Sequence, residues 1–599
     1  MLNLLFRSAA VTFILLAILS FTPSVVKAEK TLPDLQTDPL LAAMRTELQR
    51  AKESLRLPDQ PAPYFIEYWV QESVSANLSG KYGGITHTHP DLHPRRAAGV
   101  QVRVGSYEFD NMNLPLALRF NATDYADFME ENDWQLAEVP LEGEGAALRS
   151  ALWVLGDTAY KRAVGEYQKK KMLQSTGVKK EPLDDFSREK SVVFVEPIME
   201  VGVSVDDEVW KDAVRKVTGY LARQEGIMEP TMDIQAARDV NYYMNTEGTV
   251  LRTSELLYTI DISAWTRTPD GIKVANFRHF QVQDPKELPD GKKLLAEAEA
   301  LARELAELRN AEEFNPYSGP AILGPDVAGV FFHEALGHRL EGERQRMTES
   351  GQTFRDKVGD RIISEQISIV DDPTLPCFKG KSLSGHYRYD SEGVAAQKVT
   401  LVNRGKLANY LLSRTPIKGF AGSNGHARSQ NPQANLLYGH PVGRMATLMV
   451  ESENRHSLDT LKKMLIEEAK KQGKPYGLII RHIRNGETDT KGPSASGLGG
   501  NFQAFKATPV LVYAVDVATG KERLVRGVEL VGTPLVSLEK VIAAGNDDDV
   551  FNASCGAESG WVPVSVVSPS ILTAQVELQR VGGNPKRSPL LFSPFQEKR

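Results

Sequence analysis

The sequence predicts a mixed α/β protein of two domains. The chain has 599 residues, enough for more than one hydrophobic core. Segments with helical periodicity occur among segments whose apolar and polar residues alternate as they do in strands. A cluster of turn-forming residues, Asn315-Pro316-Tyr317-Ser318-Gly319-Pro320, interrupts this pattern near the middle. We therefore expect an N-terminal α/β domain over residues 29–315 and a strand-rich C-terminal domain over residues 316–599.

The first 28 residues have the pattern of an export signal. Arg7 precedes an apolar segment from Ala9 to Phe21, and Val26-Lys27-Ala28 suits cleavage before Glu29. That segment is too short to predict a spanning helix, and no later run of about 18 apolar residues occurs. We expect an exported protein, periplasmic or secreted, with no membrane span after signal removal. The alternative is an uncleaved N-terminal anchor.

Composition and charge narrow the function further. The chain is 41% hydrophobic and 25% charged, which is ordinary globular usage. Its net charge of −6 gives no basic footprint, so we expect no nucleic-acid partner. Cys377 and Cys555 are its two cysteines, and in an oxidising compartment they could form one disulfide. That pairing competes with any metal-binding role of Cys555.

The elements expected in the N-terminal domain follow from periodicity and turn signals. They are a helix over 40–55, paired strands at 65–70 and 100–104, helices at 158–173 and 209–223, strands between 232 and 283 with turns at 245–248 and 269–271, and a helix at 292–311. The charged stretch 179–190 reads as a mobile insertion.

A histidine-rich loop lies between the first two predicted strands. It contains His87, His89 and His93, and short histidine-rich tracts can bind metal. Pro90 and Pro94 indicate an irregular, solvated loop, which favours weak adventitious binding over a functional site.

The second domain begins with a short strand at 321–323, a turn at Gly324 and a helix that starts at Pro325. We expect that helix to continue through Gly342. The remaining expected elements are hairpins at 398–401 with 407–413 and at 510–517 with 523–530, and a helix at 457–471.

The helix after Pro325 carries the motif His333-Glu334-Ala335-Leu336-Gly337-His338 at the end of an apolar run. Buried imidazoles and a carboxylate need compensating partners, and a divalent metal is one. Zinc peptidases commonly space two histidines four residues apart, whereas here the spacing is five. On a regular helix the two side chains would point about 140° apart. A metal site therefore requires a distorted helix, overwound or bulged near Gly337. The alternative is a buried helix whose histidines bond to backbone or water.

A catalytic zinc takes three protein ligands and keeps one position open for water. Two residues compete for the third place. Glu341 follows in the same segment, on about the same helix face as Glu334. Cys555 lies far along the chain, and no spacing argument connects it to the histidines.

The motif, extended through Arg339-Leu340-Glu341-Gly342, resembles the H-E-A-x-G-H-x-x-E-G signature of the TldD/PmbA metallopeptidase family. The segment Cys555-Gly556, followed by Val562-Pro563-Val564 and Ser568-Pro569, is similar to the end of that family's chains. The turns Asn245-Thr246-Glu247-Gly248 and Tyr389-Asp390-Ser391-Glu392-Gly393 resemble weaker family landmarks. Departures from the better-known members are Ala557 after Cys555-Gly556, where they have Lys, a longer chain and the export signal.

The resemblance implies one zinc ion per subunit held by His333, His338 and Cys555, with Glu334 as the catalytic carboxylate. It also implies a two-domain subunit in a homodimer or a heterodimer with a related subunit. Such dimers enclose a cavity in which extended or unfolded peptides are cut. We expect an exported zinc-dependent metallopeptidase, with Glu334 as general base toward a metal-activated water.

Two alternatives remain open. A non-catalytic partner subunit would use the metal only structurally, with Glu341 as a fourth ligand closing the site. A Cys377–Cys555 disulfide would leave the two histidines with a merely structural role.

Overall fold

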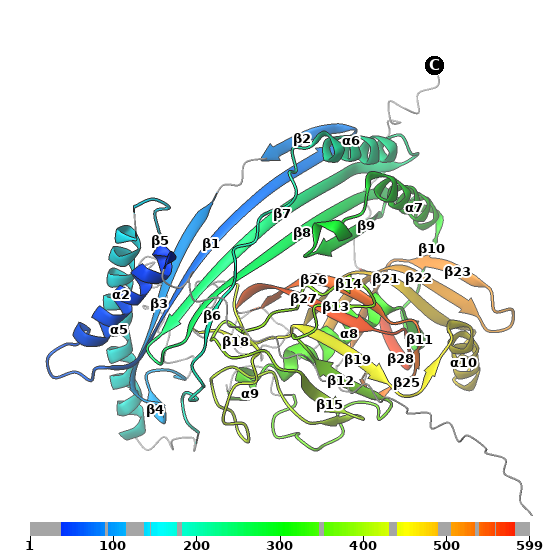
Figure 1. The fold of residues 1–599 in the computed structure, drawn as a ribbon. Helices are drawn as coiled ribbons and strands as arrows, with labels where there is room; N and C mark the ends of the chain where they lie inside the picture. Colours follow the sequence, from blue (N-terminus) through cyan, green and yellow to red (C-terminus); the bar gives the residue numbers. More distant parts are fainter. Residues whose placement is uncertain are drawn as a thin grey trace, which may run out of the picture.

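The computed structural model describes residues 37–89, 94–114, 137–143, 145–175, 183–346, 353–430, 440–488, 505–532, 538–557 and 559–581. The expected signal, residues 1–28, lies outside these ranges. The fold is mixed α/β, with a long curved sheet in the N-terminal half and two further large sheets in the C-terminal half (Figure 1). No helix among the described residues is both long and apolar enough to cross a membrane.

The N-terminal half is built on a sheet of nine strands among the described residues, with the central order β4-β3-β1-β7-β8-β6. Its long strands pair antiparallel, and their side chains alternate between the two faces of the sheet. The strands are β1 (Pro63–Lys81), β2 (Gly84–His89), β3 (Arg95–Ser106), β4 (Phe109–Asp110), β5 (Ala137–Glu138), β6 (Val193–Val195), β7 (Ile227–Asn245), β8 (Val250–Arg267) and β9 (Lys273–Val282).

The two faces of this sheet have different neighbours. Even-numbered residues of β1, β7 and β8, such as Tyr68, Ile234 and Ile260, belong to cores shared with helices. One core contains α2 (Pro39–Ser54) and α5 (Ala146–Ser175), and the other contains α6 (Glu208–Ala222) and α7 (Gly291–Asn310). The odd-numbered residues point the other way, because side chains alternate along a strand. That inner face is turned toward the C-terminal half of the chain (Figure 1).

The C-terminal half contains a nine-stranded and a six-stranded sheet among the described residues. The larger has the central order β10-β23-β22-β21-β11-β28-β25-β20 and the smaller has the order β16-β15-β12-β19-β27-β26. The strands are β10 (Glu312–Glu313), β11 (Tyr317–Leu323), β12 (Ile367–Asp371), β15 (Val399–Asn403), β16 (Lys406–Leu407), β19 (Thr447–Ser452), β20 (Arg455–His456), β21 (Tyr476–Thr488), β22 (Phe505–Asp516), β23 (Glu522–Arg526), β24 (Val528–Gly532), β25 (Val541–Gly545), β26 (Asp549–Ala557), β27 (Gly560–Ser568) and β28 (Ile571–Arg580). The short pairs β13 (Cys377–Phe378) with β14 (Lys381–Ser382) and β17 (Ala427–Arg428) with β18 (Val442–Gly443) lie outside these sheets.

Helix α8 (Pro325–Ala335) lies between the two sheets and is buried from Val327 to its end. Phe331 and Phe332 belong to one core with Ile480 of the larger sheet and Val566 of the smaller one. A Cβ at Gly329 would lie 3.0 Å from Val566, so glycine permits this close approach. Helix α10 (Leu458–Lys471) covers the opposite face of the larger sheet, with Leu461 and Leu465 in a smaller core. This layering explains why the run before His333 is apolar on every side.

The two halves are held together where the two weaker sequence landmarks meet. Arg414 donates to both carboxylate oxygens of Glu247, at 2.8 and 2.9 Å. The indole Nε1 of Trp69 donates to the carbonyl of Ser391 at 3.3 Å. Gly393, at φ +81°, packs so closely that a Cβ there would lie 2.7 Å from Thr249. The landmarks at 245–248 and 389–393 therefore form part of one contact between the halves.

Most expected elements are present, although the helix expected at 158–173 begins at Ala146, and His87 and His89 lie in strand β2 rather than in an irregular loop. Three further expectations were wrong. Residues 408–413 do not continue a hairpin, since only Lys406–Leu407 pair after the turn at 403–405. The helix that begins at Pro325 stops at Ala335 and does not run through Gly342. Residues 183–190 are the described part of the stretch 179–190, and there Asp185 is buried and bonded to Lys170 and Arg346, so this described part is not a mobile insertion. The domain boundary at 315/316 stays a prediction.

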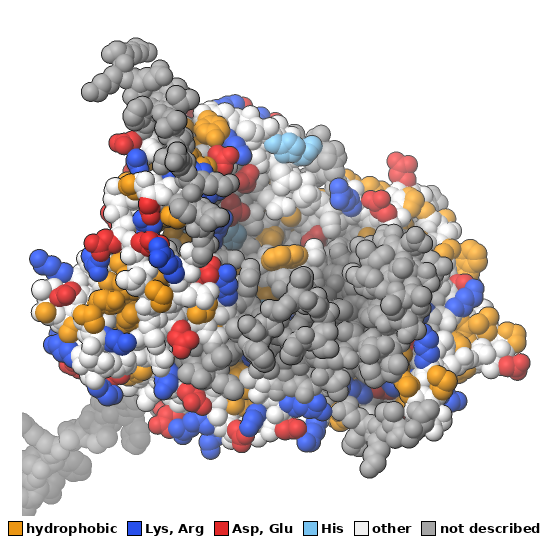
Figure 2. Space-filling view, turned by 180° about the vertical axis from the view of Figure 1, so that it is seen from behind, with side chains coloured by type: hydrophobic (Ala, Val, Ile, Leu, Met, Phe, Trp, Pro, Cys, Tyr) orange, Lys and Arg blue, Asp and Glu red, His pale blue; other side chains and the backbone are white. Residues whose placement is uncertain are grey.

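Charged side chains of both signs are interspersed over the described part of the face shown in Figure 2. This distribution accords with the small net charge of −6.

Candidate metal centre

The helix that carries the histidine motif is broken between His333 and His338. Helix α8 ends at Ala335, Leu336 leaves helical geometry at φ −120° and ψ −56°, and a 3₁₀ turn follows over Gly337–Leu340. A 3₁₀ turn is wound more tightly than an α-helix. The distortion expected from the five-residue spacing is therefore confirmed in its overwound form. Gly337 is needed there, because a Cβ would lie 1.9 Å from the sulfur of Met445.

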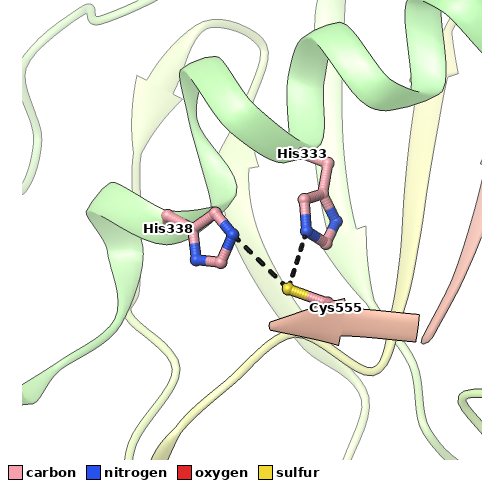
Figure 3. A group of neighbouring side chains, drawn as sticks. All are labelled: His333, His338 and Cys555. Carbon is pink, nitrogen blue, oxygen red and sulfur yellow. Dashed lines mark hydrogen bonds between the residues drawn. The ribbon is translucent and has the colours of Figure 1, made fainter. Parts of the chain in front are cut away.

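The break brings both imidazoles to the thiol of Cys555 (Figure 3). His333 Nε2 lies 3.1 Å from Cys555 Sγ, and His338 Nε2 lies 3.4 Å from the same sulfur. The ligand atoms of the three residues all lie within 4.8 Å of one another, and all three side chains are buried. Among the described residues this is the one group of three or more histidine, cysteine or acidic side chains placed to hold a metal ion.

This donor set fits zinc. Imidazole nitrogens at about 2.05 Å and a thiolate sulfur at about 2.3 Å from a tetrahedral zinc are about 3.6 Å apart. The observed nitrogen-to-sulfur distances of 3.1 and 3.4 Å are slightly shorter. Small outward movements of the side chains would therefore admit the ion. Three protein ligands also leave one tetrahedral position open.

Glu341 holds His338 in position rather than joining the ligand group. Its Oε1 accepts from His338 Nδ1 at 2.8 Å, which leaves Nε2 facing the sulfur. Arg344 donates to the other carboxylate oxygen at 2.8 Å. Burial raises the pKa of Glu341, but Arg344 and His338 outweigh it and lower the pKa to about 2. Such a carboxylate fixes the ring orientation of a metal-binding histidine and increases its basicity.

Arg444 lies directly behind Cys555. Its Nη2 donates to the carbonyl of Cys555 at 2.9 Å and to the sulfur at 3.2 Å, and its Nη1 donates to Ser559 Oγ at 2.7 Å. Burial raises the pKa of the Cys555 thiol, but His338, His333 and Arg444 outweigh it and lower the pKa well below its ordinary value. The pKa of His338 is lowered by burial but raised overall, well above its ordinary value, by Cys555 and Glu341. The group therefore favours a thiolate, the form of cysteine that binds metal.

Glu334 lies beside the three ligands without being one of them. Its Oε2 is 4.0 Å from His338 Nε2, and 8% of the residue surface is exposed. Gly486 of β21 provides room for it, since a Cβ there would lie 2.6 Å from Glu334 Cγ. Arg339 donates to the carbonyls of Glu334 and Ala335 at 2.6 and 3.3 Å, which satisfies carbonyls at the end of α8. The carboxylate thus occupies a defined place next to the ligand group.

Sequence comparison agrees with this geometry. Residues 316–580 match the family described as the PmbA/TldA metallopeptidase C-terminal domain. That match includes all three candidate ligands and Glu334. Residues 316–580 of this chain belong to the TldD/PmbA family.

Curated relatives in this family are named as metalloproteases. The "Metalloprotease" of Methanothermobacter thermautotrophicus is 27% identical over 377 residues, which is 61% of this chain and 72% of that protein. The "Metalloprotease" of Archaeoglobus fulgidus is 30% identical over 252 residues, 42% of this chain and 51% of the relative. The "Zinc metalloprotease TldD homolog" of Saccharolobus solfataricus is 33% identical over 264 residues, 44% of this chain and 51% of the relative. The matches to the last two relatives therefore span only about half of their lengths.

Solved structures share the fold across nearly the whole chain. A putative modulator of DNA gyrase from Thermotoga maritima has a TM-score of 0.56 at 14% identity, covering 90% of this chain and 99% of that one. TldE from Thermococcus kodakarensis has a TM-score of 0.55 at 14% identity, covering 90% and 100%. The TldD/PmbA fold thus includes both halves of this protein.

The N-terminal half of this TldD/PmbA chain contacts the strand that carries Cys555. Gln281 Nε2 of β9 donates to the carbonyl of Ala553 at 3.0 Å, and Asn552 Nδ2 donates to the carbonyl of Gln281 at 3.0 Å. Cys555 itself pairs with Val562 across the β26–β27 hairpin. The cysteine is therefore fixed by contacts from both halves.

The other residues considered from the sequence lie outside the ligand group. Cys377 is exposed while Cys555 is buried, and both thiols are free, so the disulfide alternative was wrong. His87 and His89 are in β2 with ring centroids 4.1 Å apart, whereas His93 lies outside the described residues.

Sequence reasoning missed Arg444, Gly486 and Gln281, and it treated Glu341 only as a possible ligand. No local motif marks the first three. For Glu341, the three-residue spacing after His338 was an available signal, because residues so spaced are neighbours on a helical turn.

Proposed function

We propose that this chain is a zinc-dependent metallopeptidase that hydrolyses peptide bonds in extended or unfolded peptides. The observation that carries the proposal is the convergence of His333, His338 and Cys555 within 4.8 Å. Family membership and the metalloprotease names of its relatives support it.

His333, His338 and Cys555 would hold the ion, and Glu341 and Arg444 would keep His338 and Cys555 in position. Bound zinc would lower the pKa of a water molecule and polarise the scissile carbonyl. Glu334 accepts the proton of the attacking water and delivers it to the leaving amine. Its place beside the ligands, 4.0 Å from His338 Nε2, suits this role.

The test separates metal binding from chemistry. We expect Glu334→Gln to retain zinc by elemental analysis but lose cleavage of unfolded peptides, because only the proton acceptor is removed. We expect Cys555→Ala to lose zinc. Cys377→Ala is the matched control, since that cysteine is exposed and is not part of the ligand group. Undiminished cleavage by the Glu334→Gln variant would reject the assigned role.

The second candidate is a non-catalytic partner subunit of a TldD/PmbA-like complex whose metal is structural. That reading requires Glu341 as a fourth ligand, whereas Glu341 is bonded to His338 Nδ1 and to Arg344. The geometry therefore favours the peptidase. Zinc-loaded protein that cleaves no unfolded peptide, alone or with a related subunit, would support the partner role.

We further propose that residues 1–28 direct export and are removed, and that the mature protein assembles as a dimer with itself or with a related subunit. The N-terminal pattern of Arg7, the apolar segment and Ala28 supports export. N-terminal sequencing of protein recovered from the exporting cell tests cleavage. Light scattering of the purified protein tests assembly, and an intact N-terminus or a stable monomer would contradict the respective expectation.

A further inference from the structure

A cavity of about 420 Å³ lies between the two halves of the molecule. The inner face of the N-terminal sheet lines one side, and the loops near Tyr387 and Arg428, with the β26–β27 hairpin, line the other. Cavities of about 300–1,000 Å³ are typical of ligand sites in proteins. This cavity is not part of the site assigned above.

The β26–β27 hairpin separates the cavity from the metal ligands. Side chains alternate along β26, so Cys555 points toward His333 while its neighbour Ser554 points the other way and lines the cavity. The hairpin would thus lie between a ligand bound in the cavity and the three metal-binding side chains.

The inner face of the sheet contributes two carboxylates to the cavity wall. Asp239 of β7 and Glu255 of β8 are directly opposite each other across the strand pair, and both line the cavity. Like charges in such positions destabilise a sheet. Burial raises the pKa of both carboxyls, although hydrogen bonding by Ser73 partly offsets this for Asp239. Among the described residues, Glu255 has no hydrogen bond or ion pair.

Arg428 lines the same cavity and is hydrogen-bonded to the backbone of the C-terminal half. Arg428 is the positive charge acting on Glu255, but its Nη1 donates to the carbonyl of Met445 at 2.8 Å. Its guanidinium also lies 5.1 Å from the ring centroid of Tyr387. The C-terminal half therefore uses a guanidinium nitrogen of Arg428 structurally, and no basic side chain forms a hydrogen bond or ion pair with Glu255 among the described residues.

Aromatic side chains complete the wall. Trp69, Tyr387 and Trp561 all line the cavity. Trp561 is 62% exposed although it stacks beside the Cys555 strand, where a Cβ at Gly556 would lie 3.0 Å from its ring. Aromatic faces attract lysine and arginine, and the attraction grows when the cation is desolvated. Carboxylates and aromatic rings in one cavity are complementary to a cationic group with an apolar stem.

We propose that this interdomain cavity binds the lysine or arginine side chain of a peptide, at Asp239 and Glu255, with the aromatic wall around its stem. The inference rests on the proposed function only in assuming that the ligand is a peptide. It names the substrate class that the enzyme prefers, which is peptides with basic residues.

The test uses zinc-loaded protein carrying Glu334→Gln, so that bound peptide is not cleaved. Two fluorescein-labelled Gly-Ser peptides are compared by fluorescence anisotropy, one with a central arginine and one with citrulline, which has a similar shape without the charge. We expect the arginine peptide to bind at least about tenfold more tightly. Equal affinities for the two peptides would overturn the proposal without any cavity variant being made.

The variants locate the binding site. Asp239→Asn with Glu255→Gln should abolish the preference for arginine over citrulline, and removing two opposed charges should not weaken the strand pair. Asp233→Asn is the matched control, because Asp233 is an exposed carboxylate on the same strand outside the cavity. A preference that persists in the double variant would place the site elsewhere.

Hydrolysis by the unmodified protein is measured separately on the same peptides. Discrimination in binding without hydrolysis would uphold this cavity and reject the peptidase. Hydrolysis of both peptides without a difference in their binding affinity would uphold the peptidase and reject this cavity as the site that binds the basic side chain.

Discussion

Glu341 is expected to control zinc affinity without contacting the ion. Its Oε1 receives the only hydrogen bond that His338 Nδ1 makes in the described structure, at 2.8 Å, and Arg344 holds its other oxygen. Removing such a partner typically lowers metal affinity about 10- to 100-fold, which corresponds to about 1.4–2.8 kcal/mol. We expect the loss of zinc affinity in Glu341→Gln to be near the lower end of this range, because an amide oxygen still accepts a hydrogen bond from His338 Nδ1. Glu341→Ala should lie near the upper end.

The assay is the apparent zinc dissociation constant from competition with a chromogenic chelator at fixed pH. Glu343→Gln is the matched control, because Glu343 is buried two residues away but bonds to Ser413 and to the backbone of Gly443. The control should bind zinc within about twofold of the unmodified protein. Unchanged affinity in Glu341→Ala, or an equal loss in Glu343→Gln, would refute the positioning role.

Three further outcomes follow from buried contacts. Gly486→Ala should lower kcat about 10- to 100-fold with zinc content unchanged, because the new methyl group displaces Glu334; a normal kcat would contradict this. Gly337→Ala should destabilise the protein by about 1–3 kcal/mol in denaturant unfolding, and Met445→Ala should partly restore stability in the double variant if overpacking is the cause. Burial raises the pKa of Glu67 from 4.5 to about 7, so its protonated form favours folding and this contribution is lost as pH rises between those values. As pH rises over that range, the Glu67→Gln variant should therefore become more stable relative to the unmodified protein, by at most about 3 kcal/mol. Melting temperatures of the two proteins that change with pH in the same way would contradict this expectation.

Much of the fold followed from local patterns. The strands that became β1, β3, β7 and β8 carry alternating residues because one face packs against helices and the other does not. Helix α10 was predicted with its ends nearly correct, since Ser457 caps it and its apolar residues recur at helical spacing. The hairpin expected at 407–413 failed, because that stretch bonds mainly to neighbouring loops rather than to a strand partner.

The candidate site was predictable only in part. The five-residue spacing of His333 and His338 required a break in the helix, and the break is present. Cys555 was chosen through family resemblance, because it lies 217 residues from His338 and no local rule spans that distance. Arg444 is 111 residues from the cysteine it contacts, so its role depends on tertiary packing that the sequence pattern does not contain. Gly486 likewise matters only through the side chain that packs against it.

The 217 residues between His338 and Cys555 determine when the three-residue ligand group can first form. Ribosomes make proteins from the N-terminus, and N-terminal domains begin to fold first. Both histidines are therefore synthesised long before the thiolate that completes the group. A growing chain, or one truncated before β26, has two ligands and no complete centre. The three-residue ligand group in this architecture therefore forms only after β26 has been added to the chain.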